Sequence, residues 1–429
     1  MSFSDLLPPF DQRGMDLSLD RMVRALEVLN HPCAQVPAVQ VVGTNGKGSI
    51  ASFVHSGLIA AGLRSGLTIS PHLVEWTERI RVNHAQISVE ALRRRLKDLQ
   101  PVAAEQQLTP FELLITAALE HFASQQVDWL VLEAGLGGRL DATTAHPNRP
   151  LLAVASIGLD HCEHLGNSLT AVAQEKAAAI QQGAVVISGP QPQEVVRVFS
   201  DRAQAMNAQL HWVDPLDSSW SLGLQGDHQR SNAAVAKAVL EHIQGMGWPG
   251  DAGSIRAGLA DAHWPGRLQS VTWRSHGLWI DGAHNPPAAE VLHHERRRWP
   301  GAEQGVTWIL AIQAHKDAPA MLHTLLTAKD QCWIVPVPGH RSWTRSKLLE
   351  RNPGWSHQLQ ELPKTAAHAS ETHAHGQNPV LQVLEQLERQ GWPAAPPVIA
   401  GSLYLIGDLL ASGALHFLPS PNIRERTDR

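Results

Sequence analysis

The stretch AVQVVGTNGKGSIASFVHSGLIAAG, residues 38–62, decides the fold of the first half of this chain. An apolar, β-branched segment leads into a glycine-rich turn, and the turn leads into a helical pattern. The turn nearly matches the phosphate-binding pattern G-x-x-x-x-G-K followed by Ser or Thr. It departs from that pattern because Gly43 lies only four residues before Lys47, and because Gly48 separates the lysine from Ser49.

A strand, a glycine turn and a helix in this order indicate a site for phosphate oxygens. Backbone N–H groups of the turn and the positive end of the helix would bind the oxygens, and Lys47 would reach the β- and γ-phosphates. Ser49 is placed to contact a magnesium ion. The alternative is a tight glycine turn that binds no ligand.

Composition narrows the class of protein. The 429 residues are 43% hydrophobic and 17% charged, as in globular chains that form two or three domains. A net charge of −5 gives no support for a nucleic-acid or membrane partner. Three distant cysteines without a C-x-x-C pair favour a reducing compartment. No signal peptide and no apolar segment of about 18 residues is evident, so we expect a cytoplasmic protein. We also expect a monomer.

Short apolar segments alternate with longer helical patterns, as expected for α/β layers. The predicted strands are Val39–Val42, Trp129–Leu132, Leu151–Ser156, Val185–Ser188, Leu278–Ile280, Thr307–Ile312, Cys332–Val337 and Pro397–Ala400. The predicted helices are Gly48–Ala61, Phe111–Ser124, Leu169–Gln181, Asn232–Gly245, Ala288–Trp299 and Ser402–Leu410. Trp-Pro-Gly within residues 262–270 ends a helix, and a new series of strands and helices follows. We therefore predict domains over residues 1–266 and 267–429.

Two further motifs place charged side chains after predicted strands. In VDWLVLEAGLGGRLDATTA, residues 127–145, a strand ends at Glu133, where an ATPase holds its metal ion. The alternative is an acid that only stabilises the glycine turn. In SIGLDHCEHLGNSLTAVAQEKAAAI, residues 156–180, His161 follows a strand and Lys176 lies on the next helix. A transition-metal cluster is a weaker alternative here, since no cysteine or second histidine at helical spacing supports it; its members would be Asp160, His161, Glu163 and His164.

These motifs, with others, occur in the order and spacing of the folylpolyglutamate synthase/dihydrofolate synthase family. They are GTNGKGS (43–49), SPHLVEWTERI (70–80), LEAGLGGRLDAT (132–143), IGLDH (157–161), EKAAAI (175–180), HQRSN (228–232), WPGR (264–267), DGAHNP (281–286) and AGSLYL (400–405). The chain thus resembles these Mur-ligase-like, ATP-dependent amide ligases, and in particular the bifunctional bacterial type. The family carries the same shortened loop. The resemblance implies an α/β fold with an N-terminal P-loop ATPase domain, built on a mainly parallel sheet, and a smaller C-terminal Rossmann-like domain.

The resemblance also implies a reaction. ATP phosphorylates a carboxylate of dihydropteroate or the γ-carboxylate of a reduced folate, and the acyl phosphate then forms an amide with L-glutamate. Phosphoryl transfer between two anions requires cations, so two magnesium ions are expected. Ser70 and Glu133 would bind one ion, and Glu133 with His161 the other. Lys176 matches a lysine that the family carries as a carbamate, which supplies an anionic oxygen to the metal.

The resemblance also implies which residues contact ATP, glutamate and folate. The ATP contacts are Asn45, Gly46, Lys47, Gly48 and Ser49 in the loop, Asn232 at adenine, Arg267 at phosphate and Asp281 at ribose. The glutamate contacts are Arg79, His284 and Ser402. The folate contacts are Phe111, Glu112, Arg139 and Asp141. The implied catalytic residues are Lys47, Lys176 and His284. Each residue has an alternative role within the fold, such as a helix cap, a salt bridge or, for Phe111, core packing.

Two other functions use the same nucleotide chemistry. A cell-wall Mur ligase carries a nucleotide-sugar domain ahead of the P-loop, but only about 40 residues precede Gly43. A nucleotide-binding regulator would leave the motifs of the second half unexplained. Two departures from the family pattern, Thr144 for Asn and His315 for Asp, remove no residue that the mechanism needs. The histidine-rich residues 361–379 are predicted to form a surface loop, with metal binding as the alternative.

Overall fold

The computed structural model describes residues 3–7, 17–362 and 378–417. The chain divides into two compact units, Met1–Trp264 and Pro265–Arg429, two residues before the predicted boundary. The histidines around residues 368–375, for which a surface loop was predicted, lie outside the described residues.

The first unit is built on a mainly parallel sheet, as predicted, with strands in the order β4-β3-β2-β5-β1-β6-β7-β8. The strands are β1 Ala38–Val42, β2 Ser65–Thr68, β3 Ile80–Val82, β4 Ala85–Gln86, β5 Trp129–Glu133, β6 Leu151–Val154, β7 Val185–Ser188 and β8 Gln209–Trp212. β1 pairs in parallel with β5 and β6, and all of its residues are buried. Fully buried strands of this kind form where helices cover both faces of a sheet. β3 and β4 add an antiparallel edge.

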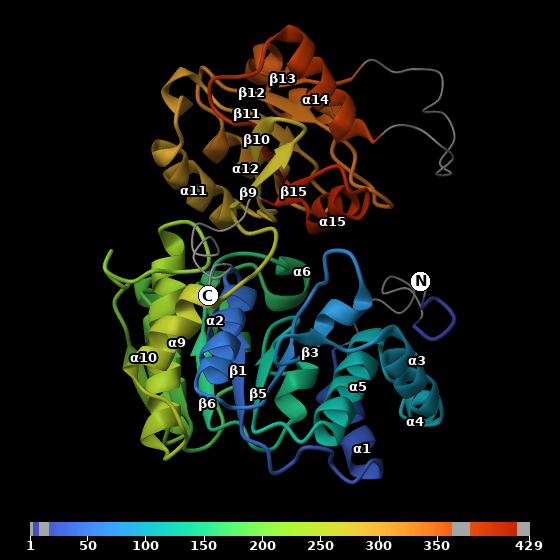
Figure 1. Cartoon of the computed structure of the whole chain (residues 1–429), viewed down its shortest axis with the longest axis vertical. Coiled ribbons are helices and arrows are strands. Elements are labelled where there is room, and N and C mark those ends of the chain that lie inside the picture. Colours follow the sequence, from blue (N-terminus) through green and yellow to red (C-terminus); the bar gives the residue numbers. More distant parts are fainter. Residues whose placement is uncertain (1–2, 8–16, 363–377, 418–429) are drawn as a thin grey trace, which may run out of the picture. The chain divides into compact units, whose positions relative to one another are not determined.

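Helices pack against both faces of this sheet (Figure 1). They are α1 Leu19–Val28, α2 Lys47–Ala60, α3 Val89–Asp98, α4 Gln100–Glu105, α5 Pro110–Ser124, α6 Cys162–Leu165, α7 Leu169–Ala177, α8 Gln193–Ala205, α9 His228–Gly245 and α10 Ala252–Asp261. Successive residues of β5 point to opposite faces, so Trp129 and Val131 share a core with α2, α9 and α10. Leu130 and Leu132 pack instead in the core that contains α1, α3 and α5.

Helices α2 and α10 cross unusually closely in this core. A Cβ atom at Gly258 would lie 2.4 Å from the Cα atom of Gly57, so the crossing requires a residue without a side chain. Leu240 of α9 occupies the space beside Gly57, where its Cδ1 would lie 2.2 Å from an added Cβ. Small residues therefore bring α2, which begins at the P-loop, into a rigid three-helix layer.

A buried histidine ties α2 to the antiparallel edge of the sheet. His55 is 6% exposed, and its Nε2–H donates to the Asn83 carbonyl at 2.8 Å. Its Nδ1 therefore accepts the hydroxyl of Ser65 at 2.7 Å, which fixes the neutral tautomer. Burial lowers the pKa of His55 from 6.5 to about 4.

We expect the free energy of unfolding to fall as the pH drops from about 6.5 to about 4. In this range the unfolded chain binds a proton at His55 that the folded chain excludes, so stability rises with pH. The contribution is complete above about pH 6.5, is lost toward about pH 4, and amounts to at most about 3 kcal/mol. Urea unfolding across this range measures it. His55→Gln keeps an N–H donor but does not titrate, so its slope against pH should be shallower; an unchanged slope would contradict the assignment.

The second unit is also an α/β structure, with strands in the order β13-β12-β11-β14-β10-β9-β15. The strands are β9 Gln269–Trp273, β10 His276–Ile280, β11 Thr307–Leu310, β12 Gln331–Ile334, β13 Leu359–Gln360, β14 Val398–Ala400 and β15 His416–Phe417. β10, β14, β11, β12 and β13 are parallel neighbours, while β9 forms a hairpin with β10 and pairs with β15. The helices are α11 Pro286–Glu295, α12 Ala318–Leu325, α13 Arg345–Arg351, α14 Pro379–Gln390 and α15 Leu403–Ala411.

A buried ion pair organises one end of the second unit. Asp330 is fully buried, and its carboxylate accepts Arg296 Nη1 at 2.6 Å and Nη2 at 2.7 Å. The same carboxylate accepts the backbone N–H groups of Val306 and Thr327, both at 2.8 Å. Its charge is thus compensated inside an apolar core, and these hydrogen bonds together lower its pKa although burial acts to raise it. The pair fixes the start of β11 against α11.

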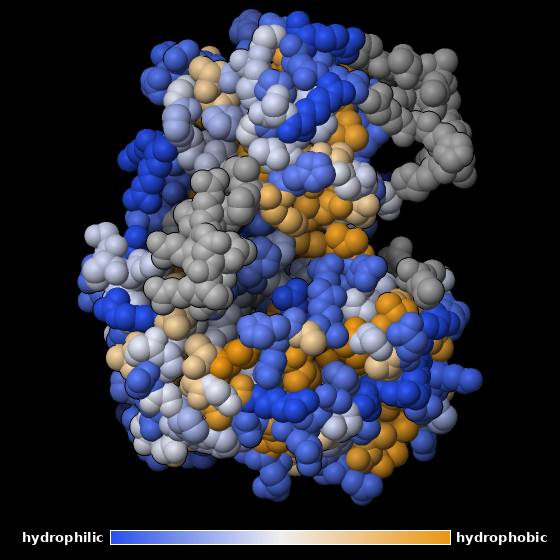
Figure 2. All heavy atoms as spheres, viewed as in Figure 1, coloured by the Kyte–Doolittle hydropathy of each residue, from blue (hydrophilic) through white to orange (hydrophobic). Residues whose placement is uncertain are grey.

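The predicted strands and helices are confirmed, with shifts at several ends. The helix predicted over Ala288–Trp299 begins at Pro286 and gives way to a 3-10 turn, Arg296–Arg298. The helix predicted to reach Gln181 ends at Ala177. Figure 2 shows mostly polar residues on the visible face of each unit, with apolar residues in smaller groups, as expected when the large apolar side chains fill the cores.

Candidate active site

The glycine turn of the first unit has the geometry of a phosphate-binding loop. α2 begins at Lys47, and Gly46 caps it with a left-handed φ of 91°. Gly43 has a φ of 146°, and a Cβ atom there would lie 2.6 Å from Ala155 Cβ. Both glycines are therefore required by the backbone itself. Because α2 starts inside the loop, its first N–H groups and its positive end face the position of a bound anion.

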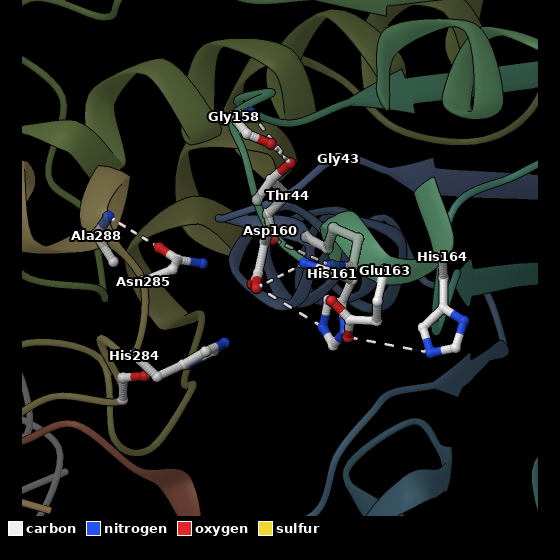
Figure 3. Close-up of polar contacts among 12 residues, drawn as sticks. Gly43, Thr44, Gly158, Asp160, His161, Glu163, His164, His284, Asn285 and Ala288 are labelled. Atoms are coloured by element: carbon white, nitrogen blue, oxygen red, sulfur yellow. Dashed lines mark hydrogen bonds and ion pairs between the residues drawn. The ribbon is translucent and has the colours of Figure 1, made fainter. Parts of the chain in front are cut away.

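The loop is fastened to the segment that follows β6 (Figure 3). The Thr44 N–H donates to the carbonyl of Ser156 at 2.8 Å, and the Thr44 hydroxyl donates to that of Gly158 at 2.9 Å. The Gly158 N–H returns a bond to the same hydroxyl at 3.1 Å. The segment continues through Asp160 to His161, so the P-loop and the predicted metal ligand His161 belong to one bonded pair of loops.

Two lysines lie at this loop. Lys47 Nζ donates to the carbonyl of Thr44 at 3.2 Å, and Lys176 Nζ donates to that of Gly43 at 2.8 Å. Lys176 is only 3% exposed. Burial and the nearby charge of Lys47 lower the pKa of Lys176 to about 7, despite opposing carboxylates that include Asp160. A sizeable share of its amine is thus neutral near pH 7, which is the form that acts as a nucleophile.

Two of the predicted metal donors, Ser70 and Glu133, lie at the ends of adjacent strands. Glu133 is the last residue of β5, is 4% exposed, and accepts the N–H of Ser70 at 2.9 Å. Ser70 follows β2, the parallel neighbour of β5. His161 caps α6 with a φ of 51°, and Figure 3 shows it between Asp160 and Glu163, at N–O distances of 3.9 Å and 3.8 Å.

These donors fit magnesium better than a transition metal. Within the described ranges, no three His, Cys, Asp or Glu side chains are arranged so that they could by themselves hold a metal ion, which gives the transition-metal alternative at residues 160–164 no support. Magnesium in phosphoryl-transfer sites is bound through one or two carboxylates, with substrate phosphates and water completing the shell. The carboxylate of Glu133, with the hydroxyl of Ser70 and the imidazole of His161 as the other predicted donors, is consistent with that requirement.

The start of α9 flanks the P-loop. A Cβ atom at Gly46 would lie 2.7 Å from Asn232 Oδ1, which places the predicted adenine contact against the loop. Asn232 donates to Gln229 Oε1 at 2.9 Å, and Gln229 Nε2 donates to Ser49 Oγ at 3.3 Å. Gln229 was not predicted, since only its spacing of one helical turn from Asn232 distinguishes it in the sequence. Trp264 packs on Gly48, where an added Cβ would lie 2.6 Å from its ring.

A small cavity lies at the carboxyl end of β2. It is lined by Thr68, Ile69, Arg79, Ile80, Phe111, Leu114, Ile115 and Ala118. The predicted glutamate contact Arg79 and the predicted folate contact Phe111 therefore share one apolar cavity. Arg79 Nε donates to His72 Nδ1 at 2.8 Å, and Trp76 stacks under the guanidinium, whose carbon lies 4.9 Å from the ring centre. Burial and Arg79 lower the pKa of His72 to about 3, so this acceptor is neutral.

Three other predicted folate contacts engage partners within the fold. Glu112 is 5% exposed and forms a buried ion pair with Arg21 at 3.2 Å, while also closing a capping box with Thr109. Asp141 is 3% exposed; its carboxylate accepts the N–H groups of Gly135, Leu136 and Thr143 and the Thr143 hydroxyl. The guanidinium of Arg139 lies on Glu175. These side chains shape the loops beside the cavity, and direct contact with folate stays a prediction.

The predicted residues of the second unit gather at the carboxyl ends of β10 and β14, which are parallel neighbours. Asp281 follows β10 and accepts the N–H groups of Leu268 and Ala283, both at 2.7 Å. His284 Nδ1–H donates to the Gly282 carbonyl at 2.7 Å, and Figure 3 shows Asn285 capping α11 just after it. Ser402 follows β14 and caps α15. Arg267 lies beside Gly282, where an added Cβ would be 2.8 Å from Nη1.

Comparison with known proteins identifies relatives along nearly the whole chain. Residues 266–412 match the family described as dihydrofolate synthetase, C-terminal domain. The chain is 32% identical over 432 residues to the dihydrofolate synthetase of Saccharomyces cerevisiae, spanning 92% of this chain and 98% of that protein. E. coli FolC in complex with DHPP and ADP superposes with a TM-score of 0.79 at 26% identity, over 95% of both chains.

A second solved structure is the bifunctional folylpolyglutamate synthase/dihydrofolate synthase from Yersinia pestis, complexed with AMPPNP and Mn ion. It superposes with a TM-score of 0.79 at 26% identity, over 94% of this chain and 95% of that one. The fold, the P-loop site and these matches define an ATP-dependent ligase of the Mur-ligase-like class. Within that class, the chain belongs to the folylpolyglutamate synthase/dihydrofolate synthase family.

Proposed function

We propose that this chain joins L-glutamate to dihydropteroate and also to the γ-carboxylate of reduced folates. The observation that carries the proposal is the order of sites along one edge of the first sheet. β2, β5 and β1 are neighbours in the sheet. Their carboxyl ends bear, in turn, the cavity with Arg79 and Phe111, the metal donor Glu133, and the P-loop. The cavity itself is only about the size of one water molecule, so we propose that the acceptor acid binds beside it, at the same edge of the sheet as the phosphates of ATP.

The reaction follows from the chemistry of carboxylates. A carboxylate is a poor electrophile, so its oxygen first attacks the γ-phosphorus of ATP, and ADP leaves. The amine of glutamate then attacks the acyl carbon, and inorganic phosphate leaves as the amide forms. Lys47 at the start of α2 neutralises charge on the transferring phosphoryl group, and the N-terminus of the helix binds the phosphate oxygens.

ATP and a divalent metal ion are the expected co-substrate and cofactor, as in the Yersinia pestis complex with AMPPNP and Mn ion. Magnesium bound at this site neutralises phosphate charge during transfer. We propose two ions, with Ser70 and Glu133 holding one and Glu133 and His161 the other. The contact of Ser70 with Glu133 and the bonded loops that carry His161 support this assignment.

We further propose that Lys176 is carbamylated. Its neutral amine nitrogen forms a bond to the carbon of carbon dioxide, and one proton is released. The product carries a negative charge and two oxygen donors, whereas an ammonium group would repel a cation. Burial at the P-loop carbonyl of Gly43 and a pKa of about 7 support the proposal, because both favour the nucleophilic neutral amine.

For the second unit, the proposed contacts keep their predicted roles. Arg267 and Asp281 are assigned to ATP, and His284 and Ser402 to glutamate and the acyl-phosphate step. Support comes from the place of Asp281, His284 and Ser402 after two parallel strands, where α/β sheets bind ligands, and from the side chain of Arg267 beside Gly282. Ser402 also begins α15, whose N-terminus favours an anion such as a glutamate carboxylate.

The choice between one and two activities is tested directly. Purified protein is incubated with ATP, magnesium and isotope-labelled glutamate, with dihydropteroate or tetrahydrofolate offered separately. We expect each acceptor to gain at least one glutamate through a new amide bond, detected by mass. Product from only one acceptor would make the enzyme monofunctional. ATP hydrolysis that is indifferent to either acceptor would favour a nucleotide-binding regulator, and would overturn the proposed ligase.

We propose that the 46.7 kDa chain acts as a monomer, which light scattering of the purified protein tests. Among the described residues, no helix is both long enough and apolar enough to cross a membrane. A cytoplasmic location stays a prediction, and tagging the protein in its cell of origin would test it.

A further inference from the structure

One pair of side chains joins the glycine loop after β5 to the helix that carries Lys176. The Arg139 guanidinium forms a fork on the Glu175 carboxylate, with Nη2 to Oε1 at 2.7 Å and Nε to Oε2 at 3.2 Å. The backbone N–H of Arg139 also donates to the carbonyl of Glu175 at 2.9 Å. Three hydrogen bonds therefore hold this loop on the last turn of α7, immediately beside Lys176.

The residue before Arg139 fits against the same lysine. A Cβ atom at Gly138 would lie 2.9 Å from the carbonyl oxygen of Lys176 and 3.1 Å from its Cα. The two backbones approach this closely only because Gly138 has no side chain. The loop thus touches Lys176 through backbone atoms, while the lysine Nζ reaches across to the Gly43 carbonyl.

Two further hydrogen bonds connect the same glycine loop to the central strand β1. The Thr144 hydroxyl donates to the Gly138 carbonyl at 2.6 Å and accepts Gln40 Nε2 at 2.7 Å. Gln40 is fully buried in the middle of β1, the strand that leads into the P-loop. The loop that packs on the backbone of Lys176 is therefore hydrogen-bonded to β1, and the P-loop that the lysine Nζ contacts directly follows the same strand.

We propose that Arg139, Glu175 and Thr144 are positioning residues that hold Lys176 at the P-loop, and that Arg139 serves the metal site rather than folate. Bidentate pairing suits this role because it fixes direction as well as distance. The pair lies at the surface, with the Arg139 side chain 58% exposed, so it contributes little to overall stability. Its effect should therefore appear at the site it orients, as outer-shell partners of metal ligands commonly act.

This inference rests on the proposed metal role of Lys176. The experiment below distinguishes a failure of that metal role from a failure of the positioning role of Arg139, Glu175 and Thr144. The variants are Arg139→Gln, Glu175→Gln and the double variant, with Lys237→Gln as the control. Lys237 forms a comparable surface ion pair with Glu241 on α9, at 2.6 Å. We expect each single variant to need about 10- to 100-fold more magnesium for half-maximal activity. The double variant should show no further change, because both substitutions break one contact.

A second readout is the carbamate itself. Incubation with 13C-labelled bicarbonate should give a carbamate NMR signal in wild-type protein and in Lys237→Gln, and a weakened signal in both site variants. Thr144→Val should behave like the site variants, whereas Thr144→Ser keeps the hydroxyl and should match wild type. KM for dihydropteroate should remain unchanged throughout.

Two results would overturn the inference. One is a raised KM for dihydropteroate in Arg139→Gln with unaltered magnesium dependence and carbamate signal, since this would make Arg139 a folate contact. The other is additive effects in the double variant. If wild-type protein gives no carbamate signal, carbamylation of Lys176 fails instead, and the magnesium dependence alone decides whether the three residues position the lysine.

Discussion

Lys47→Ala is expected to reduce glutamate ligation by about a hundredfold to a thousandfold while leaving the fold intact. Removing one preorganised charge from a phosphoryl-transfer site costs about 3 to 4 kcal/mol of transition-state stabilisation. Lys47 lies at the first position of α2, where alanine is well tolerated, so the helix should persist. Mass analysis of the glutamyl product measures the activity, and thermal unfolding checks the fold.

Lys237→Ala is the matched control, since it removes a lysine from a helix of the same unit without touching the loop. Its activity should stay near wild type. Near-wild-type turnover by Lys47→Ala would refute the assignment of residues 43–49 as the phosphate-binding loop.

Lys176→Ala is expected to lose activity by about a hundredfold or more, because it removes the proposed carbamate ligand to the metal. Its side chain is buried, so truncation leaves a space that ends at the carbonyl of Gly43. A short carboxylic acid such as acetate can place an anionic oxygen in that space. Added acetate should therefore restore part of the activity of Lys176→Ala, as measured by product formation.

The controls are acetate with wild-type enzyme and acetate with Lys47→Ala, neither of which should gain activity. Full activity of Lys176→Ala without acetate would exclude a role for the lysine. Loss of activity with no restoration, together with a lowered unfolding temperature, would indicate that Lys176 supports the fold instead of the metal.

The central strands could be predicted because their signal is local. β1, β5 and β6 are mainly apolar runs that mark buried strands of a parallel sheet, and β1 is followed by Gly43 while β5 ends at Glu133. β2, with the sequence SGLT, was missed because it is short and contains little apolar surface. β3 and β4 were missed because they are very short, and β4 is an exposed edge strand that its pairing partner rather than its hydrophobicity defines.

In the candidate site, too, features with a local sequence signal were predicted, and features that depend on distant neighbours were not. Glycine spacing identifies the P-loop, and Glu133 stands at a strand end that the sequence marks clearly. Asp141 was predicted to bind folate, and only the fold shows its carboxylate fully engaged with its own loop, while burial raises its pKa. Gln229 was missed because a glutamine on a helix carries no chemical signal until its neighbour is known.

By itself, the sequence determined the central strands, the helices that follow them and the chemistry of each motif, because glycine conformations, helix starts and apolar runs depend on neighbouring residues. Only the tertiary structure decided which motifs meet. Lys176 reaches a carbonyl 133 residues earlier, and Arg21 pairs with a glutamate 91 residues away. Such contacts depend on the order of strands in the sheet, which places distant strand ends side by side. That order results from packing of the whole core, and no local pattern encodes it.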